Sequence, residues 1–405
     1  MGFRLFFATL LTVLVLSGSR AVAAEPGEDL TVFVLTFGPG DHPFFKFGHN
    51  AILVQSQKEE SGLVYNFGTF QYDAPGLILK FLRGRFNYWL SVSSMDESFA
   101  SYVSDNRSVE AQELDLTAAQ RWALWTSLRE NARPENREYL YDYFRDNCST
   151  RVRDVVDRAV DGRVRQAGQA PAKSTFRSDA LRMTADFFPE YLGLDLALGR
   201  PTDAPITAWE AAFLPEHTRD LLRTVRIPGE SGDKPLVKSE RVLFAARRPA
   251  KPEQPPSWTL YFLVAGLALG GSLAGLGRVA QRHPAARVGL GLGSSLLGLV
   301  CGMLGLILLS FWAFTDHRAA YSNANIFLLA PWLVVLAGYG IAVALGRPSA
   351  MRKAFWLVAA AAGLAVLGLL AKVLPGLSQD NMPFVAFFLP VWLGLTAGFR
   401  WMNAS

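Results

Sequence analysis

Five apolar segments in series fill the C-terminal part of the chain, and they limit its fold more than any other feature. Each has roughly the 17 to 25 residues that a helix needs to cross a bilayer. Backbone groups inside lipid must be hydrogen-bonded within their own segment, so such segments cross as helices. We therefore predict an all-α membrane domain over residues 257–405, with transmembrane helices at about 257–277, 288–314, 324–345, 354–373 and 383–399.

Basic residues in the loops give this predicted domain an orientation. The loops after the first and third segments are rich in arginine, and the positive-inside rule places such loops in the cytoplasm. The residues before the first segment then lie on the periplasmic, extracytoplasmic side of the cytoplasmic (inner) membrane. The basic residues on which the orientation rests are Arg278, Arg282, Arg287, Arg347, Arg352 and Lys353.

The first residues of the chain have the features of a secretion signal. Arg4 supplies a positive charge, Leu5 to Leu16 is an apolar run too short to cross a bilayer comfortably, and Ala21-Val22-Ala23 is a small-residue cleavage pattern. We predict a signal peptide over residues 1–24, with an uncleaved anchor helix as the alternative.

The part of the chain between signal and membrane domain has a mixed pattern. Apolar runs rich in β-branched and aromatic residues predict strands at 30–38, 49–56, 62–70 and 86–94. Apolar spacing predicts helices at 74–85, at 117–133, after Asn147 and over most of 174–225. We therefore predict an extracytoplasmic α+β domain over residues 25–230, followed by a basic juxtamembrane linker over 231–256.

The chain has two cysteines, Cys148 and Cys301. Cys301 falls in the second apolar segment, so the two cannot pair and no disulfide framework is predicted. A lone cysteine in an oxidising compartment has no obvious structural role. The sequence has no metal-type Cys/His cluster and no phosphate-binding glycine motif, so it implies no metal or organic cofactor.

Cys148 is placed for thiol chemistry. Asn147 is a favoured N-cap, and valines at helical spacing follow it, so Cys148 is predicted in the first turn of a helix. Unpaired N–H groups and the helix dipole lower the pKa of a thiol at that position. The thiolate also needs a base that accepts and returns protons, and histidine suits that role near neutral pH.

His49 and Asn66 are the candidate partners of this thiol. His49 begins a predicted strand, and Asn66 is a polar residue inside the apolar partner strand, where it could lie opposite His49 and orient the ring. Base, orienting residue and nucleophile would then occur in a permuted papain order. The structural alternatives are a hydrogen-bonding histidine, a small buried cysteine and a turn-supporting asparagine.

Several motifs together resemble the lipoprotein N-acyltransferase Lnb family. They are "FGHNAI", "YNFGTF", "YDYFRDNCSTRVRD", "TFR" (175–177), "LGRPTD" (198–203), "FLPE" (213–216) and the outer-loop stretch "DHRAAYSNAN". The resemblance implies an extracytoplasmic domain with a permuted papain-like fold, similar to NlpC-type and lecithin:retinol acyltransferase-type proteins, followed by a membrane domain.

The same resemblance implies an activity and a set of site residues. An acyl chain would move from the diacylglyceryl group of a diacylated lipoprotein to the amine of its N-terminal cysteine, which gives a lyso-form lipoprotein. Membrane lipids and the lipoprotein are the implied partners, and nucleic acid is not. The residues are Cys148, His49 and Asn66 as the catalytic set, Asn147, Asp146 and Arg145 as supporting residues, and His317, Asn323 and Asn325 as possible substrate contacts at the membrane face.

Two other functions share these features. A membrane-tethered papain-like cysteine hydrolase of peptide or cell-wall amide bonds would use the same Cys/His pair, but in a long, open polar groove. A non-enzymatic envelope assembly protein would keep Cys148 and His49 apart or inaccessible.

Overall fold

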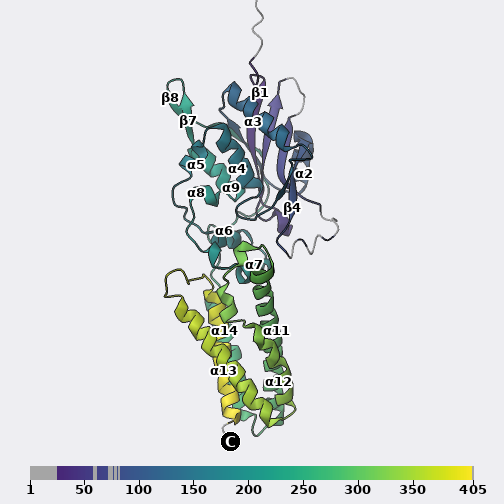
Figure 1. Ribbon diagram of the computed structural model, residues 1–405, viewed down its shortest axis with the longest axis vertical. Coiled ribbons are helices and arrows are strands. Elements are labelled where there is room, and N and C mark those ends of the chain that lie inside the picture. Colours follow the sequence, from purple (N-terminus) through teal and green to yellow (C-terminus); the bar gives the residue numbers. More distant parts are fainter. Residues whose placement is uncertain (1–24, 58–61, 72–75, 77–79, 81–82, 404–405) are drawn as a thin grey trace, which may run out of the picture.

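The structure, a computed structural model, describes residues 25–403 except 58–61, 72–75, 77–79 and 81–82. The predicted signal peptide and most of the predicted helix at 74–85 lie outside the described residues. An α+β domain stands on a bundle of long helices (Figure 1). The predicted fold class, an α+β domain followed by five membrane helices, is confirmed.

A seven-stranded antiparallel sheet forms the centre of the α+β domain, in the order β6-β4-β3-β2-β1-β5-β9. The four predicted strands are confirmed as β1 to β4. The bounds are β1 (Leu30–Phe37), β2 (His49–Ser56), β3 (Leu63–Thr69), β4 (Asn87–Ser94), β5 (Val109–Leu114), β6 (Glu138–Leu140) and β9 (Val237–Phe244), with β7 (Arg226–Gly229) and β8 (Gly232–Pro235) as a separate hairpin.

The predicted linker at 231–256 is wrong for residues 232–244, which form β8 and β9. β9 pairs with β5 as an edge strand of the main sheet. Its basic side chains meet acidic partners on the domain, such as Lys238 with Glu113 at 2.6 Å. Edge strands often carry charged side chains, so a prediction based on apolar runs does not detect this strand. The α+β domain therefore extends past residue 230.

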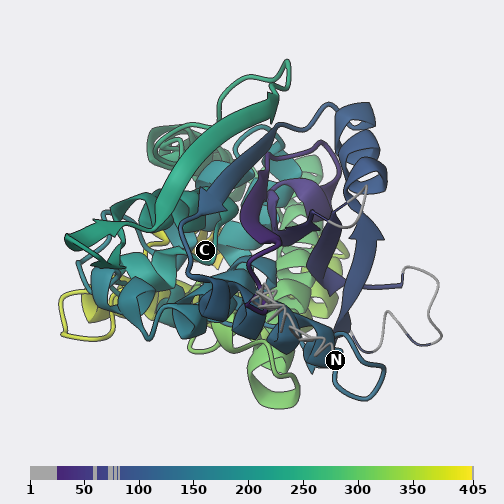
Figure 2. The same ribbon diagram turned by 90° about the horizontal axis from the view of Figure 1, so that it is seen from above.

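Helices cover both faces of the sheet because the strands alternate apolar residues on the two sides. Val34, Ile52 and Tyr65 face a layer of helices, while Leu35 and Leu53 face the other side and a single helix. Figure 2 shows the sheet between these layers. The first layer contains α3 (Ala118–Asn131), α4 (Cys148–Ala159), α5 (Arg163–Ala167) and α9 (Pro215–Thr224), and the single helix is α2 (Met95–Ser104).

The membrane domain contains the five predicted spans. Glycines permit close packing of its first and last helices: a Cβ on Gly277 would lie 2.2 Å from the Cα of Gly398. The long helices are α10 (Thr259–Val279), α11 (Pro284–Phe314), α12 (Val334–Ala344), α13 (Pro348–Ala371) and α14 (Met382–Asn403).

The third span is not one helix, in contrast to the prediction for 324–345. Its outer part consists of two 3-10 turns, Ala324–Phe327 and Pro331–Leu333, before α12 begins. Pro331 cannot donate the backbone hydrogen bond that a continuous helix would need. The break leaves polar residues of this segment free to bond with the α+β domain.

Short helices lie where the two domains meet (Figure 1). They are α6 (Phe176–Met183), α7 (Phe188–Ala197) and a 3-10 turn at Arg200–Thr202, whereas α8 (Ala208–Ala211) lies beside α5 and α9 within the α+β domain. Leu192 and Leu196 of α7 pack against the hydrophobic core of the membrane bundle. This contact brings the lower edge of the sheet close to the outer ends of the membrane helices.

Candidate active site

Cys148 is the first residue of α4, and Asn147 is its N-cap, as predicted. The Asn147 side-chain oxygen accepts a hydrogen bond from the Thr150 N–H at 3.0 Å. Its amide nitrogen donates to the carbonyls of Tyr143 and Phe213, both at 2.9 Å. Asn147 therefore positions the thiol indirectly, because it fixes the start of α4 against two neighbouring loops.

His49 is the first residue of β2 and points to the same end of the sheet. Its ring stacks on Phe37, with centroids 5.8 Å apart, and on Tyr102 at 6.2 Å. Phe37 is its direct partner on β1. Phe37 and Tyr102 also stack on each other, with centroids 3.6 Å apart, so the two rings form one aromatic surface that packs against the imidazole.

Asn66 bonds to His49, although it does not lie directly opposite it. The register pairs Ile52 with Tyr65, which sets Asn66 beside Ala51, and the side chain reaches His49 diagonally. The Asn66 Oδ1–His49 Nε2 distance is 3.3 Å.

This contact determines the tautomer of the histidine. The Asn66 amide nitrogen donates to Ser93 Oγ at 3.2 Å and to the Val64 carbonyl at 3.4 Å, so its oxygen is the atom that faces the ring. A carbonyl oxygen only accepts, so His49 Nε2 carries the hydrogen and Nδ1 is left as the basic nitrogen. That is the arrangement a general base requires.

The thiol and the imidazole interact electrostatically. Burial raises the pKa of Cys148. The charge and hydrogen bond of His49 and the backbone N–H of Asn50 lower it by more than burial raises it, and the net pKa is about 7. The thiolate fraction at neutral pH is therefore larger than that of an ordinary cysteine. Gly68, with φ +89°, keeps space beside the thiol: a Cβ there would lie 3.4 Å from the Cys148 Cβ.

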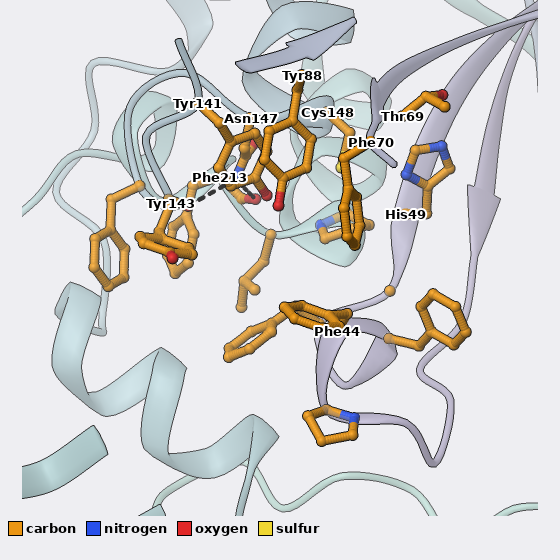
Figure 3. A pocket seen from close by; sticks show the side chains of 18 of the residues that line it. Phe44, His49, Thr69, Phe70, Tyr88, Tyr141, Tyr143, Asn147, Cys148 and Phe213 are labelled. Carbon is orange, nitrogen blue, oxygen red and sulfur yellow. Dashed lines mark hydrogen bonds between the residues drawn. The ribbon is translucent and has the colours of Figure 1, made fainter. Parts of the chain in front are cut away.

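The three residues line a cavity of about 830 Å³ that both domains share. Figure 3 shows the rings of Tyr141, Tyr88 and Phe70 next to one another in its wall. From the membrane domain the lining includes Phe311, His317, Ala319 and Ala320. The cavity is thus an aromatic space that reaches from the thiol to the outer end of α11.

Two family models match the chain. The Lnb N-terminal periplasmic domain matches residues 23–181, and the Lnb transmembrane domain matches residues 287–398. The two matches follow the order of the domains and together cover about two thirds of the sequence.

The chain belongs to the Lnb family.

This Lnb-family chain is a multi-pass membrane protein with a periplasmic N-terminal domain, and its family assignment makes it a lipoprotein-modifying membrane protein. The resemblance found in the sequence motifs is confirmed. The curated proteins and the solved structures give no significant match. The assignment to a permuted papain-like fold stays a prediction beyond the α+β class.

Asp146 and Arg145, predicted as supporting residues, do not reach the thiol. Neither residue lines the cavity. Asp146 forms a bidentate ion pair with Arg151, at 2.6 and 2.8 Å, and Arg151 lies over the Tyr139 ring at 3.6 Å. Arg145 is exposed. The contacts of Asp146 are local, so its role is to stabilise the turn before α4.

The three outer-loop residues have two different places. His317 lines the cavity, with its ring 6.4 Å from Tyr143 and 5.4 Å from Phe311. Asn323 and Asn325 are instead buried, 3% and 0% exposed, and lie outside the cavity lining. The predicted membrane-face contact is therefore wrong for these two asparagines.

Asn323 and Asn325 bond to the end of α7. The Asn323 amide donates to the carbonyls of Leu196, Ala197 and Leu198, at 2.8, 3.0 and 3.2 Å. Asn325 donates to Leu196 at 3.0 Å and accepts from Asn381 at 2.8 Å. These bonds tie the α+β domain to the membrane domain.

Arg177, from the "TFR" motif, completes this contact from the other side. It is 1% exposed, pairs with Asp195 at 2.9 Å and Asp203 at 2.7 Å, and donates to the Leu198 carbonyl at 2.7 Å. The "TFR" and "LGRPTD" motifs are thus structural partners. We call the set Arg177, Asp195, Asp203, Asn323, Asn325, Gln379 and Asn381 the domain clamp.

Sequence patterns missed Tyr102 and Gly68, which shape the space around the pair. Tyr102 lies on α2, a helix that was not predicted, and the "FG" of "YNFGTF" was the available signal for Gly68. Among the described residues, no group of three His, Cys, Asp or Glu side chains could hold a metal ion.

Proposed function

We propose that this protein is a lipoprotein N-acyltransferase of the inner membrane that carries the acyl chain on Cys148. The observation that supports this most is a thiol with a pKa of about 7 beside a basic imidazole nitrogen, in an aromatic cavity open to both domains. The expected donor is the diacylglyceryl group of the lipoprotein itself, and the product is a lyso-form lipoprotein.

The transfer takes place in two balanced steps. The Cys148 thiolate attacks the ester carbonyl, the C–O bond breaks, and the leaving oxygen takes the proton that His49 had received from the thiol. The neutral N-terminal amine then attacks the thioester, the C–S bond breaks, and His49 takes the proton that the amine loses. The ester and amine become an amide and an alcohol, and the enzyme is restored.

The start of α4 also favours the transition state. Negative charge develops on the carbonyl oxygen in both steps, and the backbone N–H groups of a helix N-terminus are donors for such a charge. The Cys148 N–H belongs to this first turn. We expect it to form part of the oxyanion hole.

The position of the cavity suits a substrate that stays in the membrane. Removing an acyl chain from lipid costs about 0.8 kcal/mol per CH₂ group, so extraction of a diacyl lipid is unfavourable. A cavity that includes Phe311 of α11 can accept the chain without that cost. The aromatic lining also favours acyl transfer over the cysteine hydrolase alternative, which needs a polar groove for peptide groups.

Mass spectrometry of a lipopeptide tests the proposal. The purified protein is incubated with a diacylated lipoprotein, and the N-terminal peptide is compared for wild type, Cys148→Ala and the control Cys301→Ala. We expect N-acylation by wild type and Cys301→Ala only. An unchanged total mass identifies the diacylglyceryl donor, and a gain of one acyl group identifies a separate lipid. An untouched lipopeptide with wild type would contradict the proposal.

A further inference from the structure

An unbroken series of aromatic contacts runs along the cavity from its rim to the membrane helix α11. Each contact joins two rings that line the same cavity. The centroid distances are 5.3 Å for Phe44–Phe70, 5.0 Å for Phe70–Tyr88, 4.1 Å for Tyr88–Tyr141, 5.6 Å for Tyr141–Tyr143, 6.4 Å for Tyr143–His317 and 5.4 Å for His317–Phe311.

The reactive thiol lies partway along this series. A Cβ on Gly68 would be 3.4 Å from the Cys148 Cβ and 3.9 Å from Cε2 of Tyr141, so the thiol and Tyr141 flank the same glycine. From Tyr141 the rings of Tyr143 and His317 lead to Phe311. Figure 3 shows Tyr141 and Tyr143 as neighbours on this side of the cavity.

Small and aliphatic residues line the cavity along with these rings. Leu194 and Ala197 come from α7, which packs on the membrane core, and Ala319 comes from the loop after α11. Phe311 lies in the last turn of α11, at its outer end. The passage therefore joins the thiol to the outer end of α11 along a mostly apolar lining.

We infer that this passage is a slot for one acyl chain of a lipid in the outer leaflet. The chain enters beside Phe311, its carbonyl carbon reaches Cys148, and the rest of the chain lies along the rings. We call Tyr141, Tyr143, Leu194, Ala197, Phe311, His317 and Ala319 the acyl slot. This inference rests on the proposed function, since it names the path by which the transferred chain reaches the thiol.

The lining chemistry supports an acyl chain as the occupant. An apolar chain that leaves the bilayer for such a lining keeps its CH₂ groups out of water. A peptide in the same place would leave backbone N–H and C=O groups facing rings and methyl groups, which is unfavourable without partners. Membrane continuity through Phe311 also gives lipid a direct route to the site.

Two thiol reagents of different chain length test the slot without any need for turnover. The full-length protein in phosphatidylcholine vesicles is treated with iodoacetamide or with N-hexadecyl iodoacetamide, and alkylation of Cys148 is followed by mass spectrometry. Ala197→Phe and, separately, Ala319→Phe place a ring in the slot. Ala360→Phe, at an exposed position of α13, is the matched control.

We expect both slot variants to react with the hexadecyl reagent about tenfold or more slowly than wild type. Their rates with iodoacetamide, and both rates of the control variant, should stay near those of wild type. Unchanged iodoacetamide reactivity also shows that the variants keep the folded site. Equal rates of wild type and both slot variants with the long reagent would overturn the inference. The reagents need no lipoprotein, so this experiment can support the acyl slot even if the N-acylation of lipopeptides fails.

Discussion

Two groups of polar residues in this molecule, the buried domain clamp and the half-buried catalytic set, differ in how many hydrogen bonds they make. In the domain clamp, the Asn323 amide donates to three backbone carbonyls, and Arg177 donates to two carboxylates and three backbone carbonyls. At the site, the Cys148 thiol interacts with the His49 imidazole, the Asn50 backbone N–H and the Ser149 hydroxyl at the wall of a cavity. The types of residue in the two groups do not by themselves show this difference.

The difference teaches which group can do chemistry. A densely hydrogen-bonded network stabilises one arrangement, because a member that moved would leave buried partners unsatisfied. A thiol with few partners and a pKa near 7 can give up and regain a proton at little cost. We therefore expect changes at the site to affect rate, and changes in the clamp to affect stability.

The largest effect is expected for Cys148→Ala. Loss of the nucleophile removes the covalent route, so N-acylation should fall by at least about 10³-fold. The thermal midpoint should change little, because the thiol lines a cavity rather than filling a core. Product formation and thermal unfolding are measured on the same preparation. A variant that keeps activity but loses stability would place Cys148 in the structural group.

His49→Gln comes next, with an expected loss of about 10² to 10⁴-fold in rate. The charge and hydrogen bond of His49 lower the pKa of Cys148, so the variant should raise it. Alkylation of wild type should rise with pH around a midpoint near 7 and then level off, and in the variant that rise should move to higher pH. Identical profiles would show that the pair is not electrostatically coupled.

Asn66→Ala should have a smaller effect, about tenfold on kcat. It removes the acceptor that fixes the His49 tautomer but leaves base and nucleophile in place. Asn66→Asp keeps an acceptor and should restore most of the rate. A loss in KM alone, or no rescue by aspartate, would contradict an orienting role.

The smallest effect on chemistry is expected in the clamp. Asn323→Ala removes one donor from each of three backbone carbonyls. Leu196 keeps its bond from Asn325 and Leu198 keeps its bond from Arg177, so stability should fall by about 1 to 3 kcal/mol. The alkylation midpoint of Cys148 should stay near 7. The exposed Arg145→Ala is the control and should change neither property. A shifted thiol pKa in Asn323→Ala would show that the two groups are coupled.

Local patterns in the sequence predicted the site better than the clamp. Asn147 before a helical valine pattern placed Cys148 correctly, and strand alternation placed His49 and Asn66 at the same end of the sheet. The clamp joins Asn323 to Leu196, residues 127 apart in the chain, and no local pattern records such a contact.

Charge and proline explain the misplaced elements. The edge strand β9 has charged residues where a buried strand would have apolar ones, so it resembled a linker. Pro331 interrupts a segment whose hydropathy still predicts a full span. Hydropathy predicts whether a segment lies in the membrane. Whether that segment is one continuous helix depends on its backbone hydrogen bonds.

An acyl-enzyme trap tests the central claim most directly. A diacylated lipopeptide with a blocked N-terminal amine can donate an acyl chain but cannot accept it, so the thioester should accumulate. We predict one acyl group on the Cys148 peptide of wild type, released by neutral hydroxylamine and absent in Cys148→Ala. No adduct with the blocked lipopeptide, together with N-acylation of the unblocked one, would contradict a covalent role for Cys148.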